Sequence, residues 1–326
     1  MRRLLLVLIL VAAAAVLVAG CGGSAGAARS DPSASLILDF TPNPVHVGIY
    51  TALARHDDAA AGVHLHVIVP GASTDSISLL EKGRVNFAIL DIHDLAIARA
   101  KGQNIVGILP IVERPLAALI AQPGITNPRQ LAGRTVGVTG DPSDTAVLNS
   151  IVSGAGGRPS SVHTITIGYD AVSDLLAGRV AAATAFWNDE GVTLNERRPG
   201  FHDFRVEDYG APAYPELVVC ATAASLRAHP GLARSVVTAL VHGYDTALAD
   251  PGLGQRSLES QVPALNHNLD TRELAALRPA FTGPEGRFGV LDLPLLRRWA
   301  QWEARFGIVH RAPDVAAMFD PAFAPR

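Results

Sequence analysis

Short apolar runs alternate with segments of helical hydrophobic spacing along the first two thirds of the chain. The apolar runs predict strands at 36–40, 65–71, 86–90, 105–112, 116–122, 135–139, 161–168, 181–187 and 215–222. The segments between them predict helices at 47–55, 75–84, 93–102, 142–156 and 171–179. After residue 222 the chain is mostly helical, with 225–250 as the longest predicted helix. Strands that alternate with helices are typical of a mostly parallel α/β architecture.

The alternation occurs in two similar units. Extended segments near 116–122 and 216–222 predict two crossovers, which assign 36–121 and 222–326 to lobe I and 122–221 to lobe II. Ligands of open α/β sheets bind beyond the carboxyl ends of the strands. This rule selects the loops 39–46, 71–75, 91–94, 139–144 and 186–191. We therefore expect two lobes joined by hinge strands, with a ligand between them.

The N-terminus has the layout of an export signal. Arg2 and Arg3 precede an uninterrupted apolar run over 4–19. This run is shorter than the roughly 20 residues that a bilayer span needs, and its flanks are those of a signal peptide. We expect a signal peptide over 1–20. The alternative is an uncleaved N-terminal anchor that happens to precede a cysteine.

The four residues VAGC that end at Cys21 resemble a bacterial lipobox, in which the cysteine becomes the lipidated N-terminus. The small and polar residues that follow predict a flexible tether over 21–35. We therefore expect an exported protein that is anchored to the outer face of the cytoplasmic membrane by lipidated Cys21. Apart from this lipid, no membrane contact is expected.

Composition removes several function classes. The chain has 27 Lys and Arg against 30 Asp and Glu, a net charge of −3, and no basic run, so we expect no nucleic-acid partner. Cys220 lies in the apolar run ELVVCAT, which predicts a buried, inert thiol. With Cys21 lipidated, no internal disulfide can form, so the fold must depend on its core.

Motifs for enzymatic chemistry are also missing from the sequence. It contains no G-x-S-x-G, no H-E-x-x-H, no metal-ligand cysteine spacing and no dinucleotide G-x-G-x-x-G after a strand. We therefore predict no enzyme activity, no cofactor and no metal.

The loop after the first predicted strand carries the best candidate binding residues. Phe40, Asn43 and His46 occur around Pro42 and Pro44, which stiffen the backbone. An aromatic ring on a stiff turn can stack on a ligand ring, and an amide offers both a donor and an acceptor. The alternative is that Phe40 belongs to the core and Asn43 caps a turn. The spacing alone leaves both interpretations open.

Two later loops provide further candidates. Gly140 and Ser143 lie at a predicted helix N-terminus, where free backbone N–H groups favour an anion or a polar ligand edge. Capping is the favoured role of Ser143, and both roles can coexist. Trp187, Asn188 and Glu190 follow a strand and could stack on a ring and accept hydrogen bonds from its amino group. The neighbouring Asp189 is expected to be a solvated acid.

The quoted residues resemble a known family. LDFTPNPVHVGIY, at 38–50, is similar to the opening motif L-D-W-T-P-N-x-x-H-x-G of the hydroxymethylpyrimidine family. That family comprises binding proteins for thiamine precursors and a fungal pyrimidine synthase. Phe40 stands where tryptophan is usual. The similarity continues through LAGRTVGVTGDPSD, ITIGYD, WNDEGVTLNE and DYGAPAYPELVV, and it covers roughly 36–225.

The resemblance implies a type II periplasmic-binding-protein fold that closes on a pyrimidine or a related heterocycle. It implies that Phe40 stacks on the ring, that Asn43 and His46 line one lobe, and that Glu190 pairs with the amino edge. Trp187 and Asn188 would complete the opposite wall. Asp91, in the loop 91–94, and Tyr214, in the segment DYGAPAYPELVV, complete the candidate set.

The family also implies the partners, an ABC permease and its ATPase, served by a monomeric binding protein. Riboflavin, an alkylsulfonate or nitrate are the alternative ligands of related proteins, and a sensor lipoprotein without transport is the alternative role. The fungal enzyme branch uses a lysine-bound pyridoxal phosphate, whereas Lys82 and Lys101, the two lysines of this chain, lie outside the predicted ligand loops.

Overall fold

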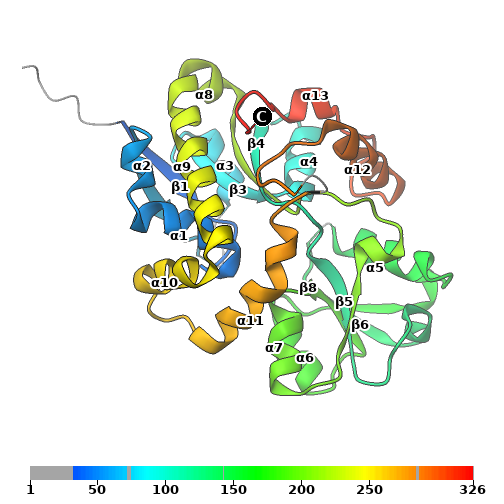
Figure 1. Cartoon of the computed structure of the whole chain (residues 1–326). Coiled ribbons are helices and arrows are strands. Elements are labelled where there is room, and N and C mark those ends of the chain that lie inside the picture. The colour runs from blue at the N-terminus through cyan, green and yellow to red at the C-terminus, as the bar shows by residue number, and fades with distance from the viewer. Residues whose placement is uncertain (1–31, 72–74, 142, 284–285, 326) are drawn as a thin grey trace, which may run out of the picture. The chain divides into compact units, whose positions relative to one another are not determined.

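The computed structural model describes residues 32–71, 75–141, 143–283 and 286–325, which belong to one compact unit. Its first sheet has five strands in the order β2-β1-β3-β10-β4 (Figure 1). Their bounds are β1 Ser33–Ile37, β2 His64–Ile68, β3 Phe87–Asp91, β4 Ile105–Val112 and β10 Leu217–Thr222. β1 is parallel to β2 and β3, whereas β10 is antiparallel to β3 and β4.

The second sheet repeats this arrangement with the order β7-β6-β8-β5-β9. Its strands are β5 Ala117–Ala121, β6 Thr135–Val138, β7 His163–Thr166, β8 Ala182–Phe186 and β9 His202–Arg205. β6 is parallel to β7 and β8, and β5 is antiparallel to β8 and β9. Each lobe is therefore a mainly parallel sheet with one antiparallel strand inserted, as the repeated sequence pattern predicts.

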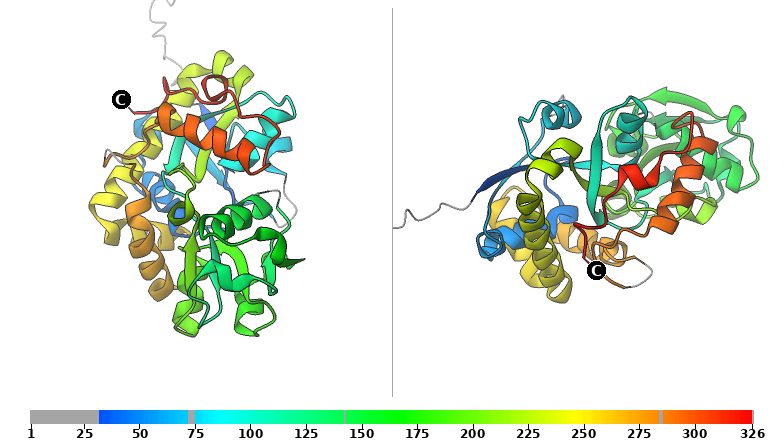
Figure 2. Two further views of the ribbon diagram at one scale, coloured as in Figure 1. Left: turned by 90° about the vertical axis from the view of Figure 1, so that its right-hand side faces the viewer. Right: turned by 90° about the horizontal axis from the view of Figure 1, so that it is seen from above.

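Helices flank both sheets (Figures 1 and 2). Those of the first two thirds are α1 Val47–Ala54, α2 Asp57–Ala60, α3 Ser76–Glu81, α4 Ile92–Ala100, α5 Asp144–Gly154, α6 Ala171–Leu176 and α7 Glu190–Arg197. Those of the last third are α8 Ala223–Ala228, α9 Pro230–Ala249, α10 Pro251–Gln261, α11 His267–Leu277, α12 Leu293–Arg305 and α13 Val315–Met318. Among these described helices, none is long and apolar enough to cross a membrane.

A close helix crossing holds the first ligand loop in place. α1 packs against α9 so tightly that a Cβ on Gly48 would lie 2.1 Å from Cγ of Tyr244, and one on Gly243 would lie 2.1 Å from the Gly48 carbonyl oxygen. Tyr244 is fully buried, and its hydroxyl donates to the carbonyl oxygen of Val45 at 2.7 Å. The long helix of the last third thus anchors the turn that follows β1.

Three boundary predictions are wrong. β1 ends at Ile37 rather than at 40 and begins at Ser33, so the predicted tether 21–35 overlaps a strand that pairs with β2. The rest of that tether, the signal peptide 1–20 and Cys21 lie outside the described residues. The predicted helix 225–250 is two helices, because Pro230 starts α9 and His229, between them, is not helical.

The predicted lobe boundaries also need correction. β5 pairs with β8 and β9 and thus belongs to the second sheet, whereas β10 pairs with β3 and β4 in the first. The chain therefore crosses between the sheets before β5 and again before β10. Lobe I cannot extend to 121 and lobe II cannot extend to 221, because each hinge segment leads into a strand of the lobe that it enters.

Candidate functional site

A cavity of about 330 Å³ lies where loops from the two sheets meet. The first lobe contributes the loop after β1, the start of α3, the end of β3 and the start of α4. The second contributes the loops after β6, β7 and β8. The side chains that line it are Asp39, Phe40, Asn43, Val45, Asp75, Ser76, Ile77, Ile89, Leu90, Asp91, Asp94, Asp141, Ser143, Tyr169, Phe186, Asn188, Asp189, Glu190 and Leu217. Of the predicted residues, Phe40, Asn43, Asp91, Ser143, Asn188 and Glu190 thus lie on its wall.

The loop after β1 is held by its own side chains. Asn43 Oδ1 accepts from the Val45 backbone N–H at 2.8 Å, and the Asn43 N–H donates to Nδ1 of His46 at 3.2 Å. Nε2 of His46 lies 2.9 Å from Oδ1 of Asp39. His46 is fully buried and does not line the cavity. The structure thus gives His46 a role in shaping the loop, while Phe40 and Asn43 face the cavity.

Two aromatic rings from different lobes meet at this cavity. Phe40 is 42% exposed, and Tyr169, in the turn after β7, is 66% exposed. Their ring centroids are 5.8 Å apart with an interplanar angle of 51°. The sequence analysis missed Tyr169 as a site residue, although it lies in the quoted segment ITIGYD. Exposed aromatic side chains paired in a cleft provide the flat apolar surface that a ligand ring needs.

The segment from the end of β8 to the first residue of α7 places two acids and one amide on the opposite wall. Oε2 of Glu190 accepts from the Phe186 backbone N–H at 3.0 Å. Burial, and then the charge of Asp189, raises the pKa of Glu190 to about 7. Asn188 is buried, and its Oδ1 has no hydrogen-bond partner among the residues that the structure describes. Asp189, expected to be solvated, also lines the cavity, and burial raises its pKa.

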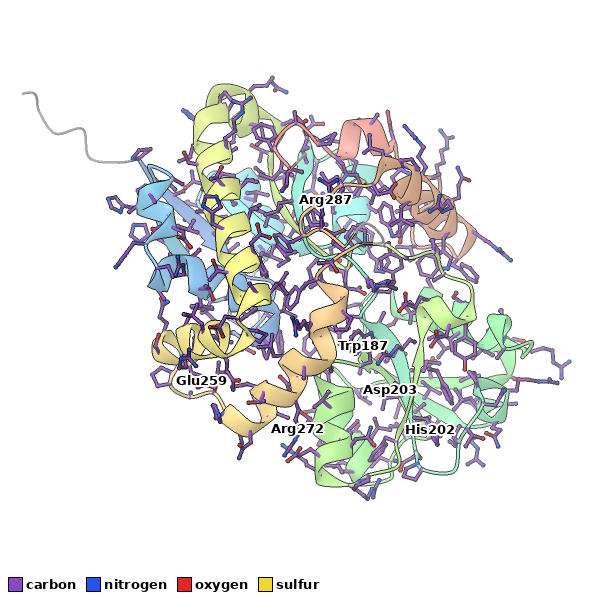
Figure 3. All side chains as sticks on the ribbon, viewed as in Figure 1. Trp187, His202, Asp203, Glu259, Arg272 and Arg287 are labelled. Atoms are coloured by element: carbon purple, nitrogen blue, oxygen red, sulfur yellow. The ribbon has the colours of Figure 1, made fainter. Side chains whose placement is uncertain are left out.

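Trp187 does not form the wall that the sequence predicts. Its indole N–H donates to the carbonyl oxygen of Pro115 at 3.0 Å, and the guanidinium carbon of Arg205 lies 3.9 Å from the ring centroid. The ring, labelled in Figure 3, is buried and is not among the residues that line the cavity. Trp187 therefore ties the end of β8 to the segment that enters β5.

The expected anion site at the start of α5 is occupied by the protein itself. Oδ2 of Asp144 accepts from the backbone N–H groups of Gly140 at 2.8 Å and of Asp141 at 3.0 Å. Gly140, with φ of 106°, allows this turn but does not line the cavity. Ser143 precedes α5 without a capping hydrogen bond from its side chain. These N–H groups are therefore not available to a ligand.

The wall of the cavity is strongly acidic. Seven carboxylates line it, and no Lys, Arg or His is among its described lining residues: Asp39, Asp75, Asp91, Asp94, Asp141, Asp189 and Glu190. Burial, and then the charges of Asp91 and Asp141, raises the pKa of Asp94 to about 7. Crowded carboxylates disfavour one another's charged forms. Such a cavity favours a ligand that carries hydrogen-bond donors or positive charge.

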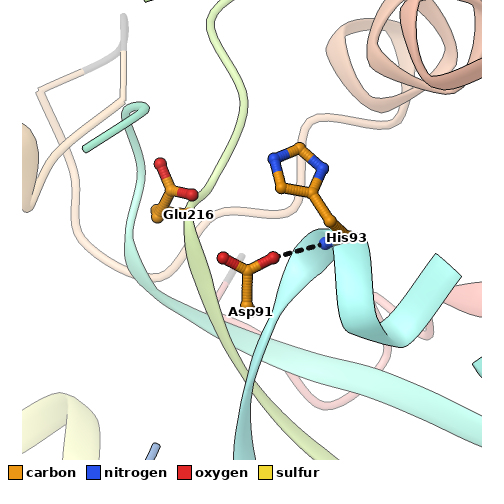
Figure 4. Close-up of side chains that lie close together, drawn as sticks. All are labelled: Asp91, His93 and Glu216. Atoms are coloured by element: carbon orange, nitrogen blue, oxygen red, sulfur yellow. Dashed lines mark hydrogen bonds between the residues drawn. The ribbon is translucent and has the colours of Figure 1, made fainter. Parts of the chain in front are cut away.

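A cluster of buried side chains adjoins Asp91, and two of its members, His93 and Glu216, are drawn with Asp91 in Figure 4. Asp91 Oδ1 accepts from the His93 backbone N–H at 2.7 Å and caps α4. Nδ1 of His93 bonds to Glu303, and Nε2 lies 3.3 Å from the Tyr214 hydroxyl. Burial alone would lower the pKa of His93, but the carboxylates around it, Glu303 foremost, raise it to about 10.

Tyr214 is therefore part of this buried cluster and does not line the cavity, contrary to its predicted ligand role. Ligand atoms of Asp91, His93 and Glu216 lie within 4.8 Å of one another, a spacing that a metal ion could accept. However, both ring nitrogens of His93 already have partners in the protein. The raised pKa favours the protonated imidazole, which has no free lone pair for a metal.

Comparisons with known proteins identify the family. Residues 43–252 match the family described as NMT1/THI5 like. The chain belongs to this family. It is 26% identical to the formylaminopyrimidine-binding protein of Halalkalibacterium halodurans over 82% of this chain and 83% of that protein. It is 21% identical to the 4-amino-5-hydroxymethyl-2-methylpyrimidine phosphate synthase THI5 of Saccharomyces cerevisiae, over 73% of this chain and 74% of that one.

Solved structures show the same fold. The ligand-binding component of an ABC-type import system from Staphylococcus aureus, solved with zinc bound, has a TM-score of 0.70 at 11% identity and covers 90% of this chain and 97% of its own. The alkanesulfonate-binding protein SsuA of Xanthomonas axonopodis pv. citri, bound to MOPS, has a TM-score of 0.69 at 13% identity and covers 90% and 100%. The predicted type II periplasmic-binding-protein fold is confirmed.

Proposed function

We propose that this protein is the solute-binding component of an ABC importer and that it binds an aminopyrimidine, a precursor of thiamine, between its two lobes. The observation that carries the proposal is the convergence of an exposed aromatic pair and a buried acid in one cavity. Phe40 and Tyr169 provide the stacking surface, and Glu190 provides the acceptor. The named binding relative, which takes formylaminopyrimidine, supports the same ligand class.

The chemistry of Glu190 suits an aminopyrimidine edge. Such an edge presents an exocyclic N–H beside a ring nitrogen, and a carboxyl group can meet both if one proton is shared between the acid and the ring. Because its pKa is raised to about 7, Glu190 can hold that proton near neutral pH. Asn188 lines the cavity, and its Oδ1, without a partner in the described part of the chain, is a second candidate acceptor for a ligand N–H.

Anionic ligands fit the cavity less well. An alkylsulfonate or nitrate would meet seven carboxylates, and the N–H groups of Gly140 and Asp141 are already bonded to Asp144. Like charges at close range disfavour binding in a cleft of low dielectric. The likeness to the alkanesulfonate-binding structure therefore concerns the fold, and riboflavin remains the alternative ligand to be tested.

A binding role, rather than synthase activity, is supported by the positions of the two lysines. Lys82 and Lys101 follow the C-terminal ends of α3 and α4, and neither lines the cavity. A lysine-bound pyridoxal phosphate, which the synthase branch would need, therefore has no amine at this site, and its phosphate would face the carboxylates. The residues present do not fit that cofactor.

The family and the N-terminal sequence support a proposal about export and partners. We propose that lipidated Cys21 anchors the protein at the outer face of the cytoplasmic membrane, that the protein acts as a monomer, and that a permease with its ATPase receives the ligand. The two-lobed fold supports this role, because closure of lobes around a ligand is a motion that a permease can recognise.

The test is a thermal-shift and calorimetric screen of the purified protein with hydroxymethylpyrimidine, formylaminopyrimidine, thiamine, riboflavin, taurine and nitrate. We expect stabilisation by an aminopyrimidine and none by taurine or nitrate. Stabilisation by riboflavin alone would refute the ligand class while leaving the fold intact. If no solute stabilises the protein, the importer role loses its support in favour of a sensor lipoprotein.

A further inference from the structure

Asp39 lines the cavity from the first lobe, and the proposed function gives it no role. It follows β1 and directly precedes Phe40, one of the two rings of the exposed aromatic pair. Only 16% of its side chain is exposed, so the carboxylate lies in a wall that is largely desolvated. A hydrogen bond to a charged acceptor is strongest where water competes least.

Two hydrogen bonds fix the tautomer of His46 and the direction of Asp39. The backbone N–H of Asn43 donates to Nδ1 of His46 at 3.2 Å, so this nitrogen presents its lone pair. The proton of the neutral ring is therefore on Nε2, which donates to Oδ1 of Asp39 at 2.9 Å. His46 is fully buried, so water does not compete for either bond.

The second carboxylate oxygen of Asp39 remains available. Within the described part of the chain Oδ2 accepts no hydrogen bond, and it is not among the covered side-chain atoms that lack a partner, so it retains accessible surface. Because Asp39 is a lining residue, that surface belongs to the cavity wall. One oxygen of this carboxylate thus holds the loop, while the other can accept from a ligand.

The loop that carries Asp39 is held rigidly. Asn43 Oδ1 accepts from the Val45 N–H at 2.8 Å, and the buried hydroxyl of Tyr244 donates to the Val45 carbonyl oxygen at 2.7 Å. An acceptor whose direction is fixed before binding loses little conformational entropy when a ligand arrives. Asp39 is therefore a preorganised acceptor.

The other acids of the first lobe are less suited to this role. Asp75 is exposed and caps α3 through Oδ1, and Asp91 caps α4 through Oδ1. Burial, and then the charges of Asp91 and Asp141, raises the pKa of Asp94 to about 7, which makes it a weaker acceptor near neutral pH. Asp39 differs from these acids because a buried side chain orients it toward the cavity.

We infer that Asp39 is a further ligand-binding residue, which accepts a hydrogen bond from a donor on a ring substituent, and that His46 is its positioning residue. The inference rests on the proposed function, in which Glu190 of the second lobe takes the amino edge of the ring. We assign the donor for Asp39 to another substituent, because the amino edge faces the second lobe. The ligand class is therefore an aminopyrimidine with a second O–H or N–H donor, held by one carboxylate from each lobe.

The test compares ligands that differ in this donor. The full protein is titrated calorimetrically with 4-amino-2-methylpyrimidines that carry hydroxymethyl, methoxymethyl or methyl at position 5. Only the hydroxymethyl arm can donate, and the two donor-free arms are one larger and one smaller than it. We expect the hydroxymethyl compound to bind about fivefold or more tightly than either of the others. Equal or tighter binding of a donor-free compound would overturn the inference.

Two matched variants assign the preference to Asp39. Asp39→Asn keeps an oxygen for His46 but replaces the free acceptor by an amide N–H, so the hydroxymethyl and methyl compounds should bind within about twofold of each other. Asp75→Asn removes one charge from the same cavity wall, keeps an oxygen for the cap of α3, and should leave the preference in place. A preference that survives in Asp39→Asn, or that is lost equally in Asp75→Asn, contradicts the assignment.

The positioning role of His46 has a spectroscopic readout that needs no variant. In protein labelled with ¹⁵N-histidine, the Nε2–H signal of His46 reports on its bond to Asp39. The hydroxymethyl compound should shift this signal more than the methyl compound does, because the same carboxylate then accepts from the ligand as well. Equal shifts with both compounds would refute the link between His46 and the ligand.

A control separates this inference from the proposed function. Glu190→Gln should weaken all three compounds together, because it acts on the ring edge that they share. If no member of the series binds, the proposed function fails. If all three bind equally, the aminopyrimidine site stands and only the role of Asp39 fails.

Discussion

Replacement of Glu190 by glutamine should weaken ligand binding and, at high pH, stabilise the empty protein, so one variant tests both roles of this side chain. The side chain begins α7 and accepts from the Phe186 N–H at 3.0 Å, a bond that a glutamine oxygen can preserve. The substitution removes the carboxyl group and, with it, the proton that this group can share with the ligand ring. For a charged hydrogen bond to the ligand we expect a loss of about 1–3 kcal/mol, which corresponds to about fivefold to about 150-fold in Kd.

The empty protein should respond in the opposite direction. Burial, followed by the charge of Asp189, raises the pKa of Glu190 from 4.5 to about 7. An acid whose folded pKa is raised binds its proton more tightly in the native state, so its contribution destabilises the fold as pH rises from about 4.5 through 7. Glu190→Gln removes this penalty, and we expect it to stabilise the empty protein at pH 8 by about 3 kcal/mol at most.

Two assays test the expected changes in ligand affinity and in stability. Calorimetric titration of an aminopyrimidine from pH 6 to 9 should show that wild-type affinity falls above pH 7, where Glu190 loses its proton, while the affinity of the variant changes little there. Urea unfolding at pH 5 and pH 8 should show that the variant gains stability only at the higher pH. Unchanged affinity together with unchanged stability would mean that Glu190 is a turn residue only.

Four further substitutions test the remaining roles. Phe40→Ala and Tyr169→Ala should each weaken ring binding by about 0.5–1.5 kcal/mol in calorimetry with little change in Tm, because both rings are partly exposed; a large fall in Tm would assign them to the core. Gly48→Ala should destabilise the protein by about 1–3 kcal/mol in urea unfolding, since its Cβ would meet the ring of Tyr244 at 2.1 Å; an unchanged midpoint would contradict the close crossing. Trp187→Phe should lower Tm through the lost bond to the Pro115 carbonyl and leave Kd unchanged, and a selective loss of affinity would restore its predicted ligand role.

The alternation of apolar runs and helices was sufficient to predict the two α/β units, because strand and helix periodicities are local properties of a sequence. It could not assign β5 and β10 to their sheets. In the sequence both are extended apolar segments. Only the pairing of β5 with β8 and β9, and of β10 with β3 and β4, shows to which lobe each strand belongs. Strand order is a tertiary property that a run of hydrophobic residues does not encode.

The residues of the candidate site were likewise predictable only in part from the sequence. Position at the end of a strand, together with the motif, was enough to select Phe40, Asn43 and Glu190, which line the cavity. The same reasoning selected His46 and Trp187, which are buried in hydrogen bonds within the protein. Sequence spacing identifies the loop but not the direction of each side chain within it, since that direction depends on what the other lobe packs against.

Tertiary structure alone brought the acids together. Asp75, Asp94 and Asp141 are separated along the chain and carry no shared motif, yet their carboxylates line one cavity. The sequence determined which loops could bind a ligand. The packing of the two lobes determined the charge of the cavity wall that such a ligand would meet, because charge in a cleft is summed over side chains that are distant in the chain.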